Sequence, residues 1–214
     1  MTNVMVVFGR TPLTLAANAA YADSHARNSP PNRFTRMTLT TVVFSIWAVF
    51  WIYWLIAAAG AKQSVRTSRC RPPGLLVIVA LVLIRLFHAG TLAVHNPILQ
   101  VVGLILFAFG LALAVWARIY LGRNWGMPMT ERAEPELVTS GPYRFVRHPI
   151  YSGLLLALLG TALATNLYFL VALVIVGAYF IYSGTVEERT MTTTFPADYP
   201  SYKEHTKMLI PFVL

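Results

Sequence analysis

Runs of apolar residues, separated by short polar segments, dominate the chain from about residue 39 onward. A helix that crosses a membrane needs about 20 mainly apolar residues. Five runs approach this length, and they predict transmembrane helices over residues 39–59, 75–94, 98–121, 149–164 and 167–186. Only Thr165 and Asn166 separate the last two runs, which predicts a helical hairpin. The pattern therefore predicts an all-α, polytopic integral membrane protein with about five transmembrane helices and a C-terminal hairpin.

The first 36 residues are mixed and polar, and a Ser-Pro-Pro-Asn cluster at 29–32 is typical of a break in regular structure ahead of the first membrane helix. No Lys or Arg precedes the short apolar stretch near the N-terminus, whereas a signal peptide begins with a basic region. We therefore expect residues 1–36 to be a polar tail. Residues 37–97 would then hold the first two transmembrane helices, and residues 98–214 the remainder of the fold.

Composition supports a membrane protein and argues against other classes. The 214 residues are 57% hydrophobic and 12% charged, whereas soluble domains carry about 25% charged residues. The net charge of +9 would suit nucleic acid if the basic side chains formed a stripe on a soluble module. They instead form short clusters between apolar runs, so we expect no nucleic-acid partner. No Cys/His spacing predicts a metal site, and the single Cys70 cannot form an intramolecular disulfide.

The distribution of Lys and Arg predicts the orientation in the membrane. Eleven of them fall in the 62–74 loop, the 122–148 loop and the C-terminal tail, which share one side of a five-helix arrangement. The other side carries only Arg10, Arg27, Arg33 and Arg36. Basic residues concentrate in cytoplasmic loops, so the N-terminus is expected outside and the C-terminus in the cytoplasm.

Small residues form a ladder along the fourth predicted helix, at Gly153, Ala157, Gly160 and Ala164. Such ladders let another helix backbone approach closely in lipid, and Gly103 and Gly110 can serve the third predicted helix in the same way. Arg85 and His88 share one face of the second predicted helix, where a charge needs water or a partner. They are read either as a structural polar pair or as participants in the chemistry.

Ionisable and polar side chains are most concentrated immediately before and immediately after the predicted hairpin. The two helices of an antiparallel hairpin have nearly equal length, so the chain returns to the face that it left. Arg147, His148 and Tyr151 should therefore lie close to Glu187 and Glu188. This brings a cation, an imidazole, a phenol and two carboxylates together at the cytoplasmic membrane surface. A solvated helix end that faces arginines is the structural alternative.

The same regions carry five sequence blocks in order: LVTSGPY at 137–143, RHPIYSG at 147–153, EE at 187–188, FPADYPSYK at 195–203 and IPF at 210–212. Together they resemble the isoprenylcysteine carboxyl methyltransferase family and its bacterial and archaeal relatives, over about residues 98–214. The resemblance implies a membrane methyltransferase of a prokaryotic plasma membrane that uses S-adenosylmethionine. It further implies that the cofactor lies at the cytosolic face and that a lipophilic or lipidated acceptor enters from the bilayer lipids.

Carried over by position, the resemblance implies one set of cofactor-binding residues: Glu136, Leu137, Val138, Tyr143, His148, Pro149, Ile150, Tyr151 and Glu187. The catalytic candidates are Arg147, which would position an acceptor carboxylate, and Glu188, which would orient Arg147. Carboxylate O-methylation needs no base, because the nucleophile is already ionised. A thiol or amine acceptor would need one, and Glu188 or His205 would then be the candidate.

The chain departs from the family pattern at Ser183, where members often have an arginine for the prenylated substrate, and at Pro196 and His205. These departures widen the expected acceptor to any small lipophilic or lipid-like molecule. Two other functions compete with methyl transfer. Sterol reductases of the membrane resemble the same core but bind NADPH, and a non-catalytic membrane protein could retain a vestigial pocket.

Overall fold

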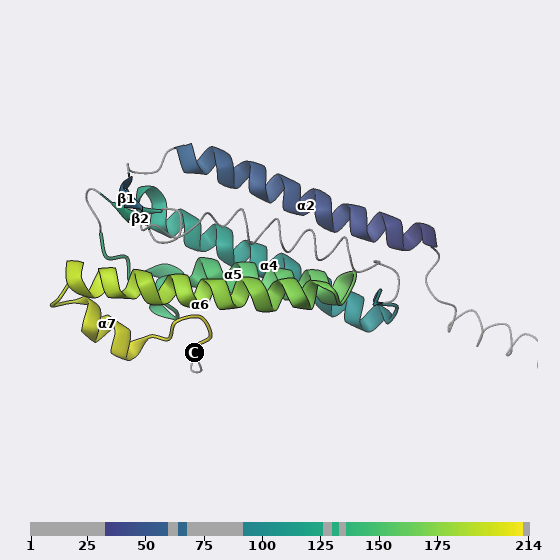
Figure 1. Cartoon of the computed structure of the whole chain (residues 1–214). Coiled ribbons are helices and arrows are strands. Elements are labelled where there is room, and N and C mark those ends of the chain that lie inside the picture. The colour runs from purple at the N-terminus through teal and green to yellow at the C-terminus, as the bar shows by residue number, and fades with distance from the viewer. Residues whose placement is uncertain (1–32, 60–63, 68–91, 126–129, 133–135, 212–214) are drawn as a thin grey trace, which may run out of the picture.

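Apolar helices make up most of the described chain (Figure 1). The computed structural model describes residues 33–59, 64–67, 92–125, 130–132 and 136–211. The four apolar helices are α2 (Arg33–Ala59), α4 (Pro97–Leu121), α5 (Pro149–Ala164) and α6 (Phe169–Thr194), and the short α7 (Tyr199–His205) follows them. Three segments are long and apolar enough to cross a membrane: Thr38–Ala58, Pro97–Leu121 and Phe169–Thr194. The described chain is therefore a helical membrane protein, as predicted.

Four of the five predicted runs are helices, with shifted ends at two of them. The first helix begins at Arg33 instead of residue 39, and α6 continues to Thr194 instead of stopping at residue 186. The extension of α6 follows from its sequence, because no Gly or Pro interrupts residues 185–194. The run at 75–94 lies outside the described residues except for 92–94, which form a turn and a bridge.

A two-stranded antiparallel ladder, which the sequence did not predict, joins two of the polar loops. Strand β1 (Ser64–Thr67) pairs with β2 (Thr130–Arg132). Two short 3₁₀ helices, η1 (Gly122–Asn124) and η2 (Gly141–Arg144), flank β2 along the chain. The ladder lies at the end where α2 and α4 finish (Figure 1), so the loops after these two helices share one end of the molecule.

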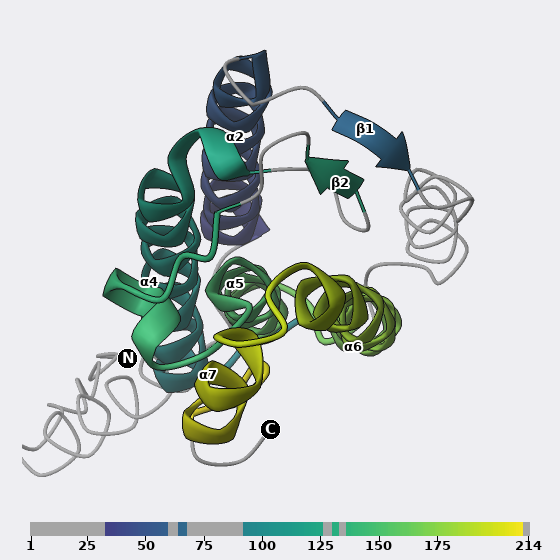
Figure 2. The ribbon, with the colours of Figure 1, turned by 90° about the vertical axis from the view of Figure 1, so that its left-hand side faces the viewer.

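Helix α5 lies between α4 and α6 (Figure 2). Helix α2 lies on the side of α4 and α5 that is opposite to α7. The α4–α5 contact uses the predicted small residues. A Cβ added at Gly103 would overlap the backbone at Ala164 and Gly160, and one at Gly110 would overlap the backbone at Ala157 and Gly153. The two backbones therefore touch directly, which confirms the predicted close approach.

Aromatic side chains fix α2 on this pair of helices. Phe50 and Trp54 are buried, while Trp51 is 46% exposed. The Trp47 ring lies tilted against that of Phe107, with centroids 5.7 Å apart, and its Nε1 donates a hydrogen bond of 3.0 Å to Oγ1 of Thr161. The aromatic face of α2 is thus a packing surface.

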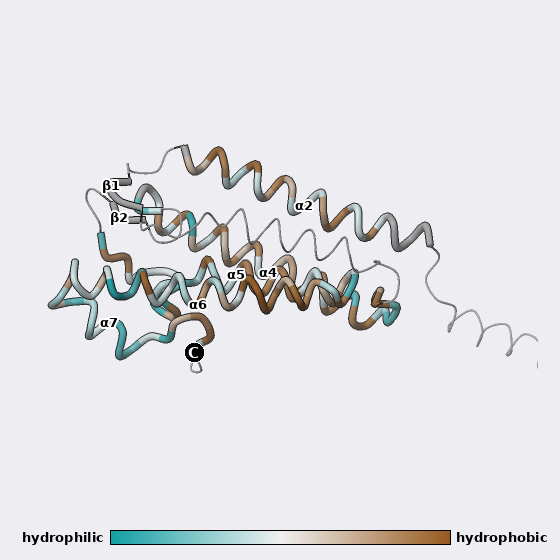
Figure 3. Tube along the Cα trace, viewed as in Figure 1, coloured by the Kyte–Doolittle hydropathy of each residue, from teal (hydrophilic) through white to brown (hydrophobic). Residues whose placement is uncertain are grey.

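The polar end of the molecule is built from the last turns of α6, α7 and the loop before α5 (Figure 3). At this end the buried Arg118 ties α4 to α2, because its guanidinium donates to the carbonyls of Gly122 and Ala57. A cation at the carbonyl ends of two helices also matches the negative ends of their dipoles. The buried hydrogen bonds of Arg118 therefore lie at the same end of the molecule as the predicted site.

Candidate active site

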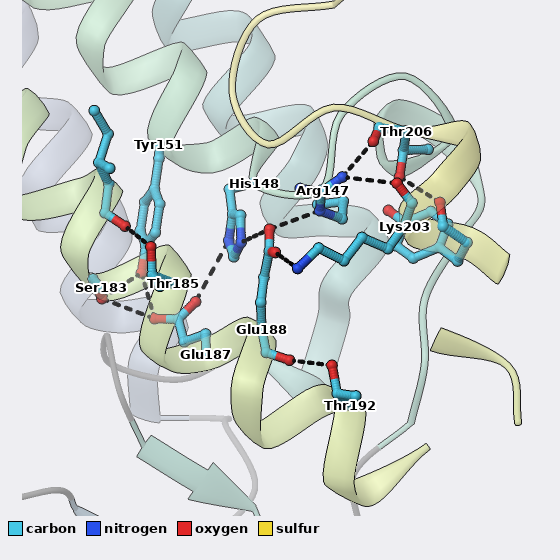
Figure 4. Close-up of polar contacts among 12 residues, drawn as sticks. Arg147, His148, Tyr151, Ser183, Thr185, Glu187, Glu188, Thr192, Lys203 and Thr206 are labelled. Atoms are coloured by element: carbon cyan, nitrogen blue, oxygen red, sulfur yellow. Dashed lines mark hydrogen bonds and ion pairs between the residues drawn. The ribbon is translucent and has the colours of Figure 1, made fainter. Parts of the chain in front are cut away.

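The hairpin brings the two polar segments together as the sequence predicted (Figure 4). Arg147 and His148 directly precede α5, Tyr151 lies in its first turn, and Glu187 and Glu188 lie near the end of α6. Pro149 opens α5 at a position where a missing N–H costs nothing. Because α5 and α6 run antiparallel, the start of one and the end of the other meet at the same level.

Arg147 and Glu188 form the centre of this cluster. Nε of Arg147 donates to Oε1 of Glu188 over 2.7 Å, and Nη1 donates to the main-chain carbonyls of Lys203, over 3.2 Å, and Thr206. Nζ of Lys203 lies 2.9 Å from the other oxygen of Glu188. Side chains of Arg147 and Glu188 are 9% and 4% exposed. Glu188 thus holds Arg147 in place, and Arg147 holds the segment after α7.

His148 stands between the two glutamates. Its Nδ1 lies 3.5 Å from Oε2 of Glu187, and its Nε2 lies 3.6 Å from Oε1 of Glu188. Nε2 is buried and has no hydrogen-bond partner within the described ranges. The imidazole stacks on the Tyr151 ring, with centroids 5.3 Å apart, and Tyr151 in turn stacks on Phe180 at 4.2 Å. This stack fixes the plane of the imidazole.

Glu187 is held on its other side by two hydroxyl groups. The phenol of Tyr151 donates to its Oε1 over 2.6 Å, and the hydroxyl of Ser183 donates to the same oxygen over 3.0 Å. Ser183 is fully buried. A larger side chain at position 183 would displace these contacts, so the departure from the family pattern is accommodated by a local hydrogen-bond network.

The segment after α7 lies against the loop before α5. The amides of Arg147 and His148 donate to the carbonyls of Lys207, over 2.8 Å, and Met208, over 3.0 Å. The Tyr202 hydroxyl donates to the carbonyl of Tyr143 over 2.6 Å. Burial raises the pKa of Tyr202 to about 12, so this phenol stays a donor at neutral pH. Main-chain contacts therefore close the C-terminal segment over the cluster.

The remaining candidate residues occupy two further environments. Tyr143, Pro149 and Ile150 are buried, and burial raises the pKa of Tyr143 well above its ordinary value. Glu136 is exposed and accepts a hydrogen bond of 3.0 Å from Nδ2 of Asn124, whereas Leu137 and Val138 are half-buried. The structure thus groups residues 147, 148, 151, 187 and 188 and gives Glu136 a different partner.

Two residues of the cluster were not among the sequence candidates for the site. Lys203 belongs to the YPSYK block that carried the resemblance, so its proximity to Glu188 had a signal in the sequence. Ser183 was noted only as a departure, and its hydrogen bond to Glu187 had none beyond helical spacing. Arg85 and His88 lie outside the described residues. Within the described chain, no group of three or more His, Cys, Asp or Glu side chains is placed to hold a metal ion.

The helices and their polar end define a helical membrane protein with a cluster of acid, base and phenol groups at one end. Most residues of this cluster lie within a segment that matches a known protein family. Residues 98–198 match the sequence model of the phospholipid methyltransferase family. The match spans α4, α5, α6 and the polar cluster except for Lys203, and it confirms the predicted resemblance to membrane methyltransferases over that region.

Two curated relatives match parts of the chain. The cobalt-zinc-cadmium resistance protein CzcN of Cupriavidus metallidurans is 29% identical over 119 residues, which are 54% of this chain and 50% of that protein. Methanethiol S-methyltransferase 1 of Bradyrhizobium diazoefficiens is 36% identical over 83 residues, which are 38% of this chain and 28% of that protein. The chain therefore spans half or less of the length of these two relatives.

Proposed function

We propose that this chain is an integral membrane methyltransferase that transfers a methyl group from S-adenosylmethionine to a lipophilic acceptor. The observation that carries the proposal is the overlap of the family match with the polar cluster. Residues 98–198 contain Arg147, His148, Tyr151 and the Glu187–Glu188 pair, and the hairpin assembles these residues at one end of the molecule. One relative that matches part of the chain is itself named as a methyltransferase.

The cluster fits the demands of a sulfonium donor with an amino acid and a nucleoside part. Glu187 would bind the amine or the ribose hydroxyls of the donor, and His148 would donate to its carboxylate. Tyr143 and Tyr151 would cover the adenine, with Pro149 and Ile150 forming the apolar floor at the start of α5. Glu136, Leu137 and Val138 would line the segment that leads to this site. S-adenosylmethionine would supply an activated methyl group, and the protein would supply alignment and exclusion of water.

The short α5 favours an acceptor that comes from the bilayer. Its 16 residues rise about 24 Å at about 1.5 Å per residue, which is less than the hydrocarbon thickness of about 30 Å. The cluster at its start would therefore lie near the edge of the hydrocarbon region, on the side we propose to be cytoplasmic. A lipophilic acceptor could reach this level without leaving the membrane.

The acceptor group is the finer part of the proposal. A carboxylate acceptor, as in the isoprenylcysteine carboxyl methyltransferases, would use Arg147 as its anchor, with Glu188 orienting Arg147. A relative of this chain is named for methanethiol, which raises a sulfur acceptor as the second possibility. A carboxylate acceptor needs a cation to anchor it, whereas a thiol acceptor needs a base to remove its proton.

Thermal-shift titration of the detergent-purified protein with S-adenosylhomocysteine and, separately, with NADPH tests the cofactor. A ligand that binds the folded state raises the melting temperature in a concentration-dependent way. We expect a response to S-adenosylhomocysteine and none to NADPH. A response to NADPH alone would move the chain to the reductases, and a folded protein that responds to neither would favour the non-catalytic alternative.

A further inference from the structure

The outer face of the C-terminal segment is a surface that the candidate site does not use. Residues 142–148, which precede α5, and residues 206–211, which follow α7, lie side by side here. Val146 pairs with Lys207 in a parallel bridge, and the amide of Arg147 donates to the carbonyl of Lys207 over 2.8 Å. The two stretches therefore form one unit, which we call the paired segments.

The end of the paired segments lies level with the first turn of α5. The hydroxyl of Ser152, which belongs to that turn, donates to the carbonyl of Leu209 over 2.5 Å. The chain runs from α7 back alongside the long helices (Figure 1), and its colouring changes from hydrophilic at α7 to hydrophobic at its end (Figure 3). A helix as short as α5 begins near the edge of the hydrocarbon region, so the residues beside Leu209 lie at that edge as well.

Two apolar side chains of the paired segments are left uncovered by the protein. Phe145 is 48% exposed and Ile210 is 52% exposed, whereas the adjacent Val146 and Leu209 are buried. Single exposed apolar residues are common on protein surfaces. At the rim of membrane helices, however, such side chains enter the boundary between headgroups and acyl chains. Phe145 and Ile210 are therefore suited to contact with lipid.

The paired segments also carry exposed basic side chains and no acidic ones. Neither residues 142–148 nor residues 206–211 contain Asp or Glu. Arg144 and Lys207 are exposed, and among the described residues neither side chain has an ion pair or a hydrogen bond. The Arg144 guanidinium lies over the Phe145 ring, 4.5 Å from its centroid. A guanidinium placed over a ring keeps its N–H groups available to an anion.

We propose that the paired segments bind anionic phospholipid at the membrane surface. Arg144 and Lys207 bind the headgroup phosphate through charge-assisted hydrogen bonds. Phe145 and Ile210 enter the upper part of the acyl-chain layer. A soluble phosphate or an acidic peptide would satisfy the cations alone and would leave both apolar side chains in water. A lipid is therefore the partner that fits the whole surface, and its anionic charge matches the two cations.

Lipid on this surface holds the C-terminal segment from outside. From inside, the segment is held by Nη1 of Arg147, which donates to the carbonyl of Thr206, and by Ser152. An anionic lipid bridges the two paired segments, because Arg144 belongs to one of them and Lys207 to the other. This inference does not depend on the proposed methyltransferase activity, so the two can fail separately.

Thermal-shift titration of the detergent-purified full chain with dioctanoyl phosphatidylglycerol tests the partner. Dioctanoyl phosphatidylcholine, with the same acyl chains and no net charge, is the control, and inorganic phosphate is titrated separately. Each ligand that binds the folded state raises the melting temperature. We expect phosphatidylglycerol to act at an about 20-fold lower concentration than phosphatidylcholine, and phosphate to have no effect at that concentration. An equal response to both lipids, or to phosphate and phosphatidylglycerol, would overturn the inference.

Charge-removing variants test the assignment of the two cations. Arg144→Gln and Lys207→Gln should each raise the required concentration of phosphatidylglycerol about fivefold, and the double variant should respond to both lipids alike. Without added lipid they should melt like the unmodified protein, because both side chains are exposed. Arg189→Gln removes the same charge from an exposed position of α6, outside the paired segments, and should keep the preference. An equal loss in all three single variants would indicate attraction by the overall positive charge and would overturn the site.

Proteolysis gives a measurement that does not depend on melting. Phosphatidylglycerol should slow tryptic cleavage after Lys207 more than phosphatidylcholine does, and Arg144→Gln, which keeps this lysine, should lose the extra protection. Phe145→Ala should weaken the response to both lipids, because the apolar contact and the ring under the guanidinium are removed. Equal cleavage in the two lipids would overturn the inference. The affinity for S-adenosylhomocysteine, measured on the same samples, separates failure of this surface from failure of the proposed donor site.

Discussion

Helix α5 meets its two neighbours in opposite ways. Against α4 it presents small residues along its length, and the two backbones touch at positions such as Gly110 and Gly153. Against the end of α6 it presents Tyr151, whose hydroxyl donates to Glu187, while the preceding His148 lies between the two glutamates. One side of α5 is close-packed backbone, and the other carries the polar groups at a single end.

The contacts that hold α5 in place are therefore different from the side chains that form the candidate site. The α4–α5 contact needs no polar side chain, since close packing itself holds helices together where lipid supplies no hydrophobic drive. It therefore gives α5 a fixed position from which a few polar side chains at its first turn can be aimed. Substitutions on the α4 side should change stability alone, whereas substitutions at the polar end should change ligand binding or the attachment of the C-terminal segment.

Gly160→Ala should have the largest effect. The added Cβ would overlap backbone atoms of Phe107 and Gly103, so the two helices would have to separate. We expect a loss of about 3 kcal/mol, the upper end for overpacking of a close-packed interior. The melting temperature in detergent measures it.

Gly177→Ala is the matched control for this substitution. Gly177 lies in α6, and a Cβ there would make an ordinary contact of 3.8 Å with Leu155. The gain in helix propensity, up to about 1 kcal/mol, should leave the melting temperature unchanged or raised. Equal melting temperatures for the two variants would contradict the backbone contact between α4 and α5.

Glu188→Gln should come second, at about 2 kcal/mol, because it weakens charge-assisted hydrogen bonds to a buried partner. Arg147 loses its anionic partner, and with it the anchor of the C-terminal segment. We expect a lower melting temperature together with faster tryptic cleavage after Lys203 and Lys207. Glu204→Gln, on the exposed face of α7, is the control. If both variants resisted trypsin equally, the ion pair would not be what holds the segment.

Much of this arrangement could be predicted because it follows from spacing. The glycine and alanine ladder indicated the α4–α5 contact, and hairpin geometry indicated that His148 and Glu187 would meet. The contacts from Lys207 and Met208 to the main chain of Arg147 and His148 could not be predicted in the same way. They use main-chain amides and carbonyls, which every residue carries, so no side-chain pattern marks them.

The sequence predicted the ends of helices and the roles of small polar residues less well than it predicted the helix contacts. The predicted fifth helix stopped at the first charge, but helix-forming residues and threonine hydroxyls, such as that of Thr192 bonded to the Glu188 carbonyl, continue α6 to Thr194. In the sequence, Ser183 was only a departure from the arginine that family members often have, whereas in the structure its hydroxyl donates a hydrogen bond to Glu187. The sequence thus predicted which residues would meet at the end of the hairpin, and the partners of their side chains required the structure.

Tyr151→Ala should weaken binding of S-adenosylhomocysteine about tenfold, which corresponds to about 1.4 kcal/mol. It removes both the ring that stacks on His148 and the hydroxyl that donates to Glu187. Tyr151→Phe keeps the ring and should lose only about threefold, and Glu187→Ala should resemble Tyr151→Ala. Calorimetric titration measures the affinities. Tyr182→Ala, at an exposed position of α6, is the control, and unchanged affinity in both Tyr151→Ala and Glu187→Ala would remove these residues from the site.

Lys203→Met should have the smallest effect, although it breaks an ion pair with the same buried Glu188. The Lys203 side chain is 49% exposed, and an exposed cation gains only about 0.5 kcal/mol from such a pair because water and salt screen it. We expect a slightly lower melting temperature at low salt and no difference from the unmodified protein at high salt.

Lys207→Met removes another exposed cation whose main chain, rather than its side chain, contacts Arg147, so it should melt like the unmodified protein at both salt concentrations. The two lysine variants therefore distinguish the side-chain ion pair of Lys203 from the main-chain contact of Lys207 in holding the C-terminal segment. If Lys203→Met lowered stability as much as Glu188→Gln and salt did not reduce the loss, Lys203 would be an integral member of the buried cluster. The polar end of α5 would then depend on α7 as firmly as its other side depends on α4.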